Sequence, residues 1–174
     1  KMLGTDSQTL MWNALDLKGA ATRAADGLRV DVAVTNSSTG HAVPTDAPIR
    51  SVMLVVEAFD AGGNPLALRD GPRLPEWTGN YAGRSGRGYA KILKDLWTGE
   101  APTAAYWRQV ELVEDTRLFP AKTDASSYLF DAPADAARVT VKLIYRPAFY
   151  KVAQQKGWPD NDFLMNELTI SVAN

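Results

Sequence analysis

The sequence has no cysteine and only one histidine among its 174 residues. These two counts exclude disulfides, thiol nucleophiles, iron–sulfur clusters, zinc fingers, metal sites built from several histidines, and the Cys-x-x-Cys-His motif that attaches haem covalently. A single histidine does not define a Ser/His/Asp triad, no glycine-rich phosphate loop follows a strand, and no pair of carboxylates stands out. We therefore expect this chain not to be an enzyme.

A strong charge of one sign and a long hydrophobic run are also missing. The 19 basic and 20 acidic residues leave a formal net charge of −1, so no overall field attracts nucleic acid or an anionic membrane. No stretch reaches the roughly 18 apolar residues of a membrane-spanning helix, and no intact signal peptide is present. We expect no nucleic-acid partner and no membrane insertion. The start at Lys1 indicates a processed chain or a domain of a longer protein.

The composition that remains is typical of a folded domain. The residues are 45% hydrophobic and 22% charged, and a chain of this length can bury a core without further support. We predict a lead-in segment over residues 1–13 that contains a short helix capped by Asp6 or Ser7, and a single domain over residues 14–174.

Alternation of apolar and polar residues predicts a protein made of strands, most clearly over residues 28–35 and 139–145. The other predicted strands cover residues 15–18, 52–59, 106–113, 127–130 and 168–172. A turn over residues 60–65 is expected to return the chain into 66–68 as a hairpin, and one or two helical turns are expected over 149–156.

The order of these elements predicts the class of the fold. The strands follow one another without a regular alternation with helices, which favours an all-β antiparallel sandwich of immunoglobulin or fibronectin type. One long irregular loop, rich in glycine and proline, is expected between Gly62 and Gly88.

The densest group of unusual residues lies between the second and third predicted strands. Gly40 can adopt a positive φ, Pro44 stiffens the chain, Thr45 can hydrogen-bond the local backbone, and Arg50 ends the stretch. These residues predict a rigid, shaped loop. The loop also holds His41, whose imidazole could bind iron or copper, or could brace the loop through its ring nitrogens.

Two further groups could have a binding role or a structural one. Arg117 could hold the carboxylate of Asp115 in a bidentate pair, or an exposed Arg117 could bind a partner. Residues 69–94 carry six basic and two acidic residues, an excess of +4. This segment is a solvated basic loop or a surface for a glycan, an acidic protein, haem propionates or, least of all, nucleic acid. The residues of this possible partner surface are Arg73, Trp77, Tyr81, Arg84 and Arg87.

Several motifs also follow one another in a recognisable order. The first is Val34-Thr35-Asn36, followed by Thr39-Gly40-His41-Ala42-Val43-Pro44-Thr45, Pro48 and Arg50. The others are Tyr89-Ala90-Lys91-Ile92-Leu93, Tyr106-Trp107-Arg108, Asp115-Thr116-Arg117 with Pro120, and Leu143-Ile144-Tyr145-Arg146. In order and spacing they resemble the C-terminal β-sandwich domain of bacterial multihaem c-type cytochromes. The resemblance covers most of residues 15–172.

This resemblance implies a non-catalytic accessory domain involved in electron transfer. In such cytochromes an N-terminal portion holds the haems in Cys-x-x-Cys-His motifs, which this chain lacks, so haem c is expected in the parent protein and not covalently bound here. The implied partners are a haem-bearing domain or subunit and redox proteins, in the periplasm or outside the cell. His41 would be a haem axial ligand or a loop brace. The alternative is a free-standing cell-envelope module that binds a glycan or a peptide through Trp77, Tyr81 and the nearby arginines.

Overall fold

The structure is a computed structural model that describes residues 11–45, 47–131, 137–159 and 162–172. The predicted N-terminal helix falls mostly on residues 1–10, outside the described residues, although Met11 and Trp12 are helical. Within the described ranges, no helix is both long and apolar enough to cross a membrane.

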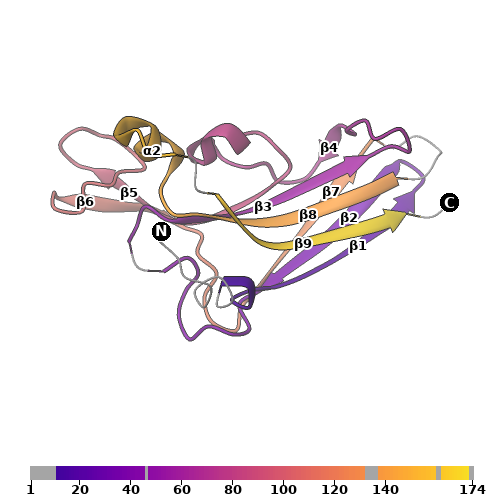
Figure 1. Cartoon of the computed structure of the whole chain (residues 1–174), viewed down its shortest axis with the longest axis horizontal. Coiled ribbons are helices and arrows are strands. Elements are labelled where there is room, and N and C mark those ends of the chain that lie inside the picture. Colours follow the sequence, from indigo (N-terminus) through magenta and orange to yellow (C-terminus); the bar gives the residue numbers. More distant parts are fainter. Residues whose placement is uncertain (1–10, 46, 132–136, 160–161, 173–174) are drawn as a thin grey trace.

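The described residues form nine strands in two antiparallel sheets (Figure 1). The four-stranded sheet has the order β1 (Asp16–Ala24), β2 (Gly27–Thr35), β7 (Thr123–Phe130) and β4 (Leu68–Asp70). The five-stranded sheet has the order β6 (Val110–Asp115), β5 (Gly86–Asp95), β3 (Ser51–Phe59), β8 (Ala137–Arg146) and β9 (Phe163–Val172). The prediction of an all-β antiparallel sandwich is confirmed.

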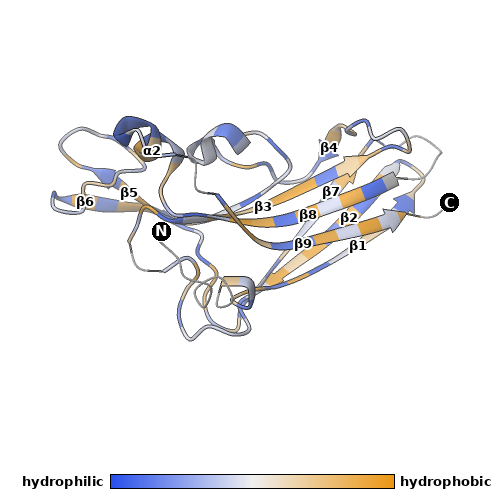
Figure 2. Cartoon of the chain, in the orientation of Figure 1, coloured by the Kyte–Doolittle hydropathy of each residue, from blue (hydrophilic) through white to orange (hydrophobic). Residues whose placement is uncertain are grey.

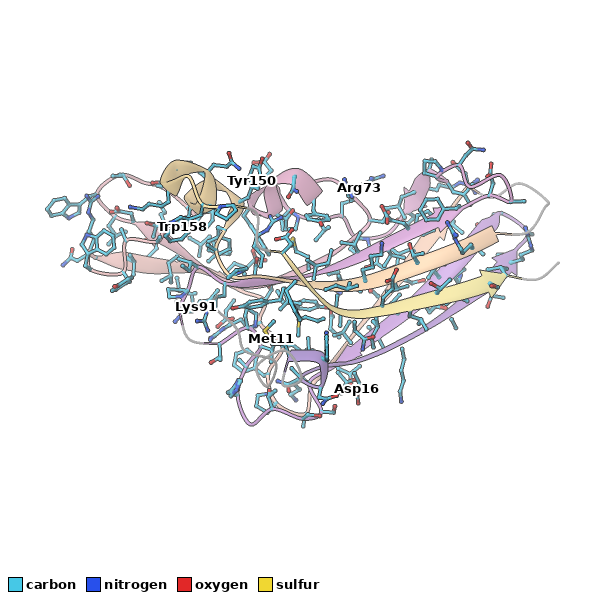
Figure 3. The ribbon with its side chains drawn as sticks, viewed as in Figure 1. Met11, Asp16, Arg73, Lys91, Tyr150 and Trp158 are labelled. Atoms are coloured by element: carbon cyan, nitrogen blue, oxygen red, sulfur yellow. The ribbon has the colours of Figure 1, made fainter. Side chains whose placement is uncertain are left out.

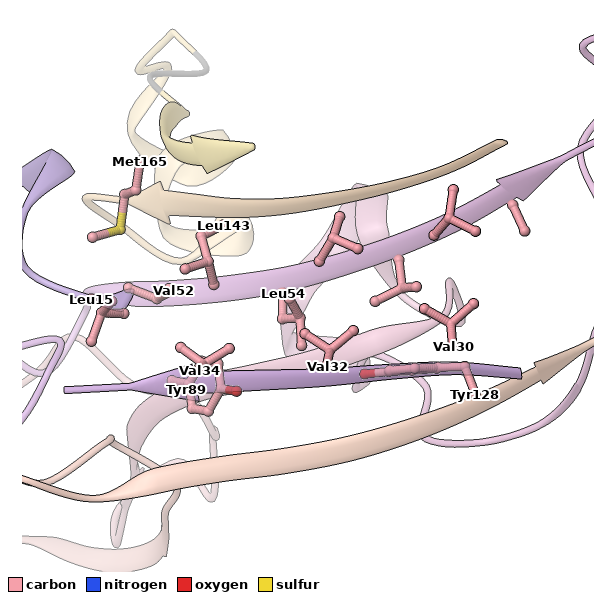
Figure 4. Close-up of a cluster of buried hydrophobic side chains, with 14 of the residues drawn as sticks. Leu15, Val30, Val32, Val34, Val52, Leu54, Tyr89, Tyr128, Leu143 and Met165 are labelled. Atoms are coloured by element: carbon pink, nitrogen blue, oxygen red, sulfur yellow. The ribbon is translucent and has the colours of Figure 1, made fainter. Parts of the chain in front are cut away.

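The main core lies between the two sheets. Inward-facing Val30, Val32 and Val34 of β2 are buried and alternate with outward-facing residues, because successive side chains of a strand point to opposite faces. They face Leu54 of β3 and Leu143 of β8 across the sandwich (Figure 4). The same apolar bands run along the strands in Figure 2. Each buried side chain of this size stabilises the fold by about 1.5–3 kcal/mol relative to exposure.

The five-stranded sheet is buried on its second face as well. Residues 51–56 of β3 are all buried, so this strand has no wet face. The second face is covered by the 3₁₀ helix η1 (Glu76–Tyr81) with the segment before it and by α2 (Tyr150–Lys156) (Figure 1). The covering clusters are Met53, Val55, Leu74 and Ile144, and Ala90, Ile92, Phe149 and Val152.

Three parts of the chain differ from the prediction. The expected irregular loop contains β4 and η1, and its last residues begin β5, a strand that the sequence did not predict because its glycines and charged residues hide its alternation. The turn at 60–65 forms and returns the chain as predicted as far as Leu66, whose N–H donates to the Ala58 carbonyl at 2.8 Å, but residues 68–70 then form β4, which pairs with β7 of the other sheet. Residues 106–109 precede β6 as a turn and an extended segment, so that strand begins later than predicted.

Candidate functional site

Two loops that the sequence singled out separately meet in the structure. The loop between β2 and β3 carries His41, and the loop between β6 and β7 carries Arg117. Val43 N–H donates to the Leu118 carbonyl at 2.9 Å, and Leu118 N–H donates to the Val43 carbonyl at 2.9 Å, which makes a short antiparallel bridge. We call residues 36–50 and 116–122 the loop pair.

Asn36 ties the loop pair together. Its side chain is fully buried, and Nδ2 donates to the carbonyls of His41 at 2.8 Å and Leu118 at 2.9 Å. Its Oδ1 accepts from the Thr39 backbone N–H at 3.2 Å and lies 2.7 Å from the Thr39 hydroxyl. Its own backbone N–H and carbonyl bond to the loop between β6 and β7. Each polar group of this buried amide therefore has a partner, as burial requires.

The imidazole of His41 is exposed and takes no part in this network. Its Nδ1 lies 3.2 Å from the Ala42 carbonyl. Because a carbonyl only accepts, Nδ1 is the donor of this bond, so Nε2 is the ring nitrogen that can bind a metal when the ring is neutral. Within the described residues, Nε2 has no hydrogen-bond partner. The backbone carbonyl of His41 joins the Asn36 network, whereas its ring makes one hydrogen bond, to the neighbouring residue.

The other predicted loop residues have more local roles. Gly40 does not adopt the positive φ that the sequence suggested, and a side chain there would meet open space. Pro44 is buried and follows a cis peptide bond. The Arg50 guanidinium donates to the backbone carbonyl of Thr45 at 3.4 Å, so the Thr45 main chain provides this contact. Gly40 is therefore a tolerant position, whereas Pro44 belongs to the packed part of the loop.

Asp115 and Arg117 form a bidentate pair at the start of the β6–β7 loop. Arg117 Nε donates to Asp115 Oδ1 at 2.8 Å, and Nη2 donates to Oδ2 at 2.6 Å. Both side chains are about four-fifths buried, at 21% and 20% exposed. The hydrogen bonds from Arg117 lower the pKa of Asp115, and the bonds to Asp115 raise the pKa of Arg117.

Replacing Asp115 by asparagine is expected to lower the free energy of unfolding by about 0.5–1 kcal/mol at pH 7, the usual size for a partly exposed ion pair. The folded-state pKa of Asp115 is lowered, so its contribution is complete above the unfolded pKa and is lost as pH falls through the folded value. The gap between variant and wild type should therefore narrow below about pH 4. Urea unfolding at pH 7 and pH 3 tests this, with exposed Asp70→Asn as control. A gap independent of pH would contradict it.

The five residues predicted as a partner surface do not form one surface. Trp77 packs edge-to-face on Phe149, with 5.8 Å between ring centroids, and covers Gly88, where a Cβ would lie 2.5 Å from the indole. Arg87, the residue before Gly88, faces the other side of β5, and its Nη1 lies 3.1 Å from Asp124 of β7. Successive residues of a strand point to opposite faces, so the sheet separates Arg87 from Trp77.

The remaining members of that group stay together around η1. Arg73 donates to the carbonyls of Gly83 and Leu68, each at 3.0 Å. The Arg84 guanidinium lies 5.0 Å from the centroid of the Tyr81 ring. Figure 3 shows Arg73 on the same side of the five-stranded sheet as Tyr150 of α2. These arginines contact carbonyls and a ring of their own segment, and Arg84 also lies 3.8 Å from Glu57, so Arg73, Tyr81 and Arg84 form a smaller group than the predicted partner surface.

Arg146 organises this second face, and the sequence indicated it only as part of a motif. Its side chain is 5% exposed, and Nε and Nη2 donate to the two carboxylate oxygens of Asp162 at 2.7 Å each. Nη1 donates to the Thr78 carbonyl at 2.7 Å, and the guanidinium lies 5.3 Å and 5.6 Å from the ring centroids of Tyr81 and Tyr150. One cation thus joins β8, η1, α2 and the start of β9.

Metal ligands are few in this arrangement. Across the ranges that the structure describes, no group of three or more histidine, aspartate or glutamate side chains is placed to hold a metal ion. The exposed Nε2 of His41 can supply one nitrogen ligand to an iron centre whose other ligands come from elsewhere.

No protein-family model matches the chain, and no curated protein matches it. Among solved structures, it is similar to a penta-heme cytochrome c552 from Thermochromatium tepidum, with a TM-score of 0.74 and 22% sequence identity. The likeness covers 98% of this chain and 43% of that chain, so this chain spans less than half the length of the cytochrome. The two proteins therefore share the fold of the sandwich.

Proposed function

We propose that this chain is a non-catalytic accessory domain of a multihaem c-type cytochrome that works in electron transfer and packs against a haem-bearing portion outside the chain. The observation that carries the proposal is the likeness to the penta-heme cytochrome c552, which extends over almost the whole sandwich. More than half of that cytochrome lies outside the matched part. The equivalent portion of the present protein would hold the haems.

The residues of this chain limit what it can contribute. Without cysteine it cannot attach haem c covalently, so the haem belongs to the parent protein. The proposed partners are this haem-bearing domain or subunit and soluble redox proteins, and the proposed location is the periplasm or the cell exterior. A haem c in the parent would supply one-electron redox chemistry.

His41 is the residue proposed to reach the haem iron. The hydrogen bond from Nδ1 to the Ala42 carbonyl orients the ring and leaves the Nε2 lone pair available, which is how proteins commonly prepare a metal-binding imidazole. Asn36 fixes the backbone carbonyl of His41, so the imidazole is attached to a rigid support. These contacts support a ligand role over a bracing role.

The alternative of a free-standing envelope module for a glycan or a peptide uses Trp77, Tyr81 and the nearby arginines. One of these residues, Trp77, packs its ring on Phe149 and over Gly88. It is retained as an outcome of the test that follows.

The test is the visible spectrum of the longest natural form of the protein, together with a haem stain of the denatured chain. We expect a covalent haem signal. A natural form that adds only a leader segment and carries no haem would overturn the proposal and favour the envelope module.

Replacing His41 by alanine is expected to leave the free energy of unfolding unchanged within about 0.5 kcal/mol, because the ring is exposed and bonds only to its neighbour. In the haem-loaded natural form the same change should alter the absorption spectrum through loss of an axial nitrogen. Exposed Thr45→Ala in the same loop is the control for both measurements. An unchanged spectrum would remove the ligand role, and a melting temperature several degrees lower would indicate a brace.

A further inference from the structure

The tip of the β5–β6 hairpin carries large aromatic side chains that the fold leaves uncovered. Trp97, Tyr106 and Trp107 are 78%, 74% and 70% exposed. Leu96, next to Trp97, is nearly half exposed, and Leu112 and Val113 of β6 are each slightly more than half exposed. We call Leu96, Trp97, Tyr106, Trp107, Leu112 and Val113 the hairpin face. Figure 1 shows this hairpin at the end of the molecule beyond the sandwich core.

The hairpin face is held in a defined shape. The carboxylate of Asp95, which is buried, accepts from the Trp97 backbone N–H at 2.8 Å and from Arg108 Nη1 at 3.0 Å. The hydrogen bond from Trp97 is the main cause that lowers the pKa of Asp95. The Arg108 guanidinium lies 5.7 Å from the Trp97 ring centroid, and Tyr106 and Trp107 pack edge-to-face at 5.3 Å. A buried acid thus positions exposed rings, which is an arrangement suited to presenting them.

The exposed area is comparable with part of a protein interface. An aromatic side chain contributes roughly 150–250 Å², so three rings at these exposures present on the order of 400 Å². A standard interface buries about 800 Å² on each partner, and the leucines and valine add to the rings. Trp and Tyr are also the residues most enriched among those that dominate binding energy.

Three cations around the hairpin face are paired with carboxylates. Arg108 lies 3.0 Å from Asp95, and Lys94 lies 3.9 Å from Glu111. The Lys151 ammonium of α2 lies 2.8 Å from Glu100. A surface with paired charges and exposed rings complements an apolar, uncharged protein surface, whereas nucleic acid or an anionic membrane would require unpaired cations.

A second copy of this chain is disfavoured at the open edge of β6. Antiparallel pairing of two β6 strands about Leu112 and Val113 would place Glu111 of each copy opposite Glu114 of the other. Like charges directly opposite one another destabilise a strand pair, and charged edges are a common protection against such pairing.

The hairpin face continues toward the proposed haem ligand. Strand β6 runs from the hairpin to the loop pair, where Phe119 is 48% exposed beside the Leu118 that bridges to Val43. One further exposed apolar side chain, that of Phe119, therefore lies on the loop that bridges to the loop carrying His41.

We infer that the hairpin face is the surface on which the haem-bearing portion of the cytochrome packs. This inference rests on the proposed function. It names the apolar residues that the contact buries, with Trp97 and Trp107 as anchors.

The experiment is hydroxyl-radical footprinting of the longest natural form of the protein, read by mass spectrometry. Trp158 serves as the internal control, because it is 47% exposed and lies outside the hairpin face. If the hairpin is free, Trp97 and Trp107 oxidise faster than Trp158. If the haem-bearing portion covers them, both tryptophans oxidise at least fivefold more slowly than Trp158. A variant with Trp97→Ser and Trp107→Ser should then increase the labelling of Phe119, whereas the control Trp158→Ser should not.

The outcomes separate the two proposals. Haem in the natural form with rapid oxidation of both tryptophans overturns this inference and leaves the proposed function in place. The absence of haem overturns both. Protection that disappears on tenfold dilution, with a dimer in sedimentation, shows that a second copy covers the face and also overturns the inference.

Discussion

Arg146→Ala is expected to lower the free energy of unfolding by about 3–5 kcal/mol, because it leaves one partner of a largely buried ion pair without its counter-charge. Four hydrogen bonds at 2.7 Å to Asp162, Thr78 and Asn80 are lost together. The space between the rings of Tyr81 and Tyr150 is emptied as well. For a chain of this length the melting temperature should fall by roughly 10 °C or more.

The conservative variant separates charge from geometry. Arg146→Lys keeps the positive charge, but an ammonium group cannot donate in the planar fork that meets both oxygens of Asp162, and it does not stack on two rings in the same way. We expect a loss of about 2 kcal/mol, between the alanine variant and the wild type. The measurement is urea unfolding followed by tryptophan fluorescence.

The matched control is Arg69→Ala. Arg69 also pairs with a carboxylate, that of Asp131, but both side chains are about half exposed, so its loss should be at most about 1 kcal/mol. Equal losses for the two alanine variants would contradict the view that Arg146 is the centre of the second face.

The sequence predicted the strands whose environment matches a simple alternation. Strand β2 has one face in the core and one in water, so its period of two was visible. Strand β5 was missed because two of its positions must be glycine to make room for neighbouring groups. Gly88 leaves room for the Trp77 ring, and a Cβ at Gly86 would lie 1.9 Å from the Leu54 carbonyl oxygen. In the sequence these glycines look like those of a loop, although close packing within a strand requires each of them.

The same distinction applies to the candidate site. The pairing of Asp115 with Arg117 could be anticipated because the two residues are two positions apart and fit a bidentate geometry. The hydrogen-bond partners of Arg146 lie 16 to 68 positions away, so only the fold brings them together. The predicted basic surface failed for a related reason, since one linear segment crosses from one face of a sheet to the other.

Asn36→Asp is expected to lower the free energy of unfolding by about 3 kcal/mol at pH 7, although the two side chains have nearly the same shape. The variant replaces an NH₂ group that donates to two carbonyls at 2.8 Å and 2.9 Å with an oxygen that can only repel them. Two carbonyl acceptors left without their donor, together with a buried carboxylate, carry a penalty of this size. The loop pair would loosen, and the support for His41 would be lost with it.

The pH dependence of this variant identifies its cause. Burial, together with the two carbonyls that face the oxygen replacing Nδ2, should raise the folded-state pKa of the new carboxyl more than the Thr39 donors on the other oxygen lower it, so the folded state binds the proton more readily than the unfolded state. Stability relative to wild type should therefore improve as pH falls from 7 toward 4.5. The same substitution at exposed Asn13 should change the free energy of unfolding by less than about 0.5 kcal/mol at either pH. A loss of unfolding free energy for Asn36→Asp that is equally small, or that grows as pH falls, would show that the amide of Asn36 does not hold the loop pair together.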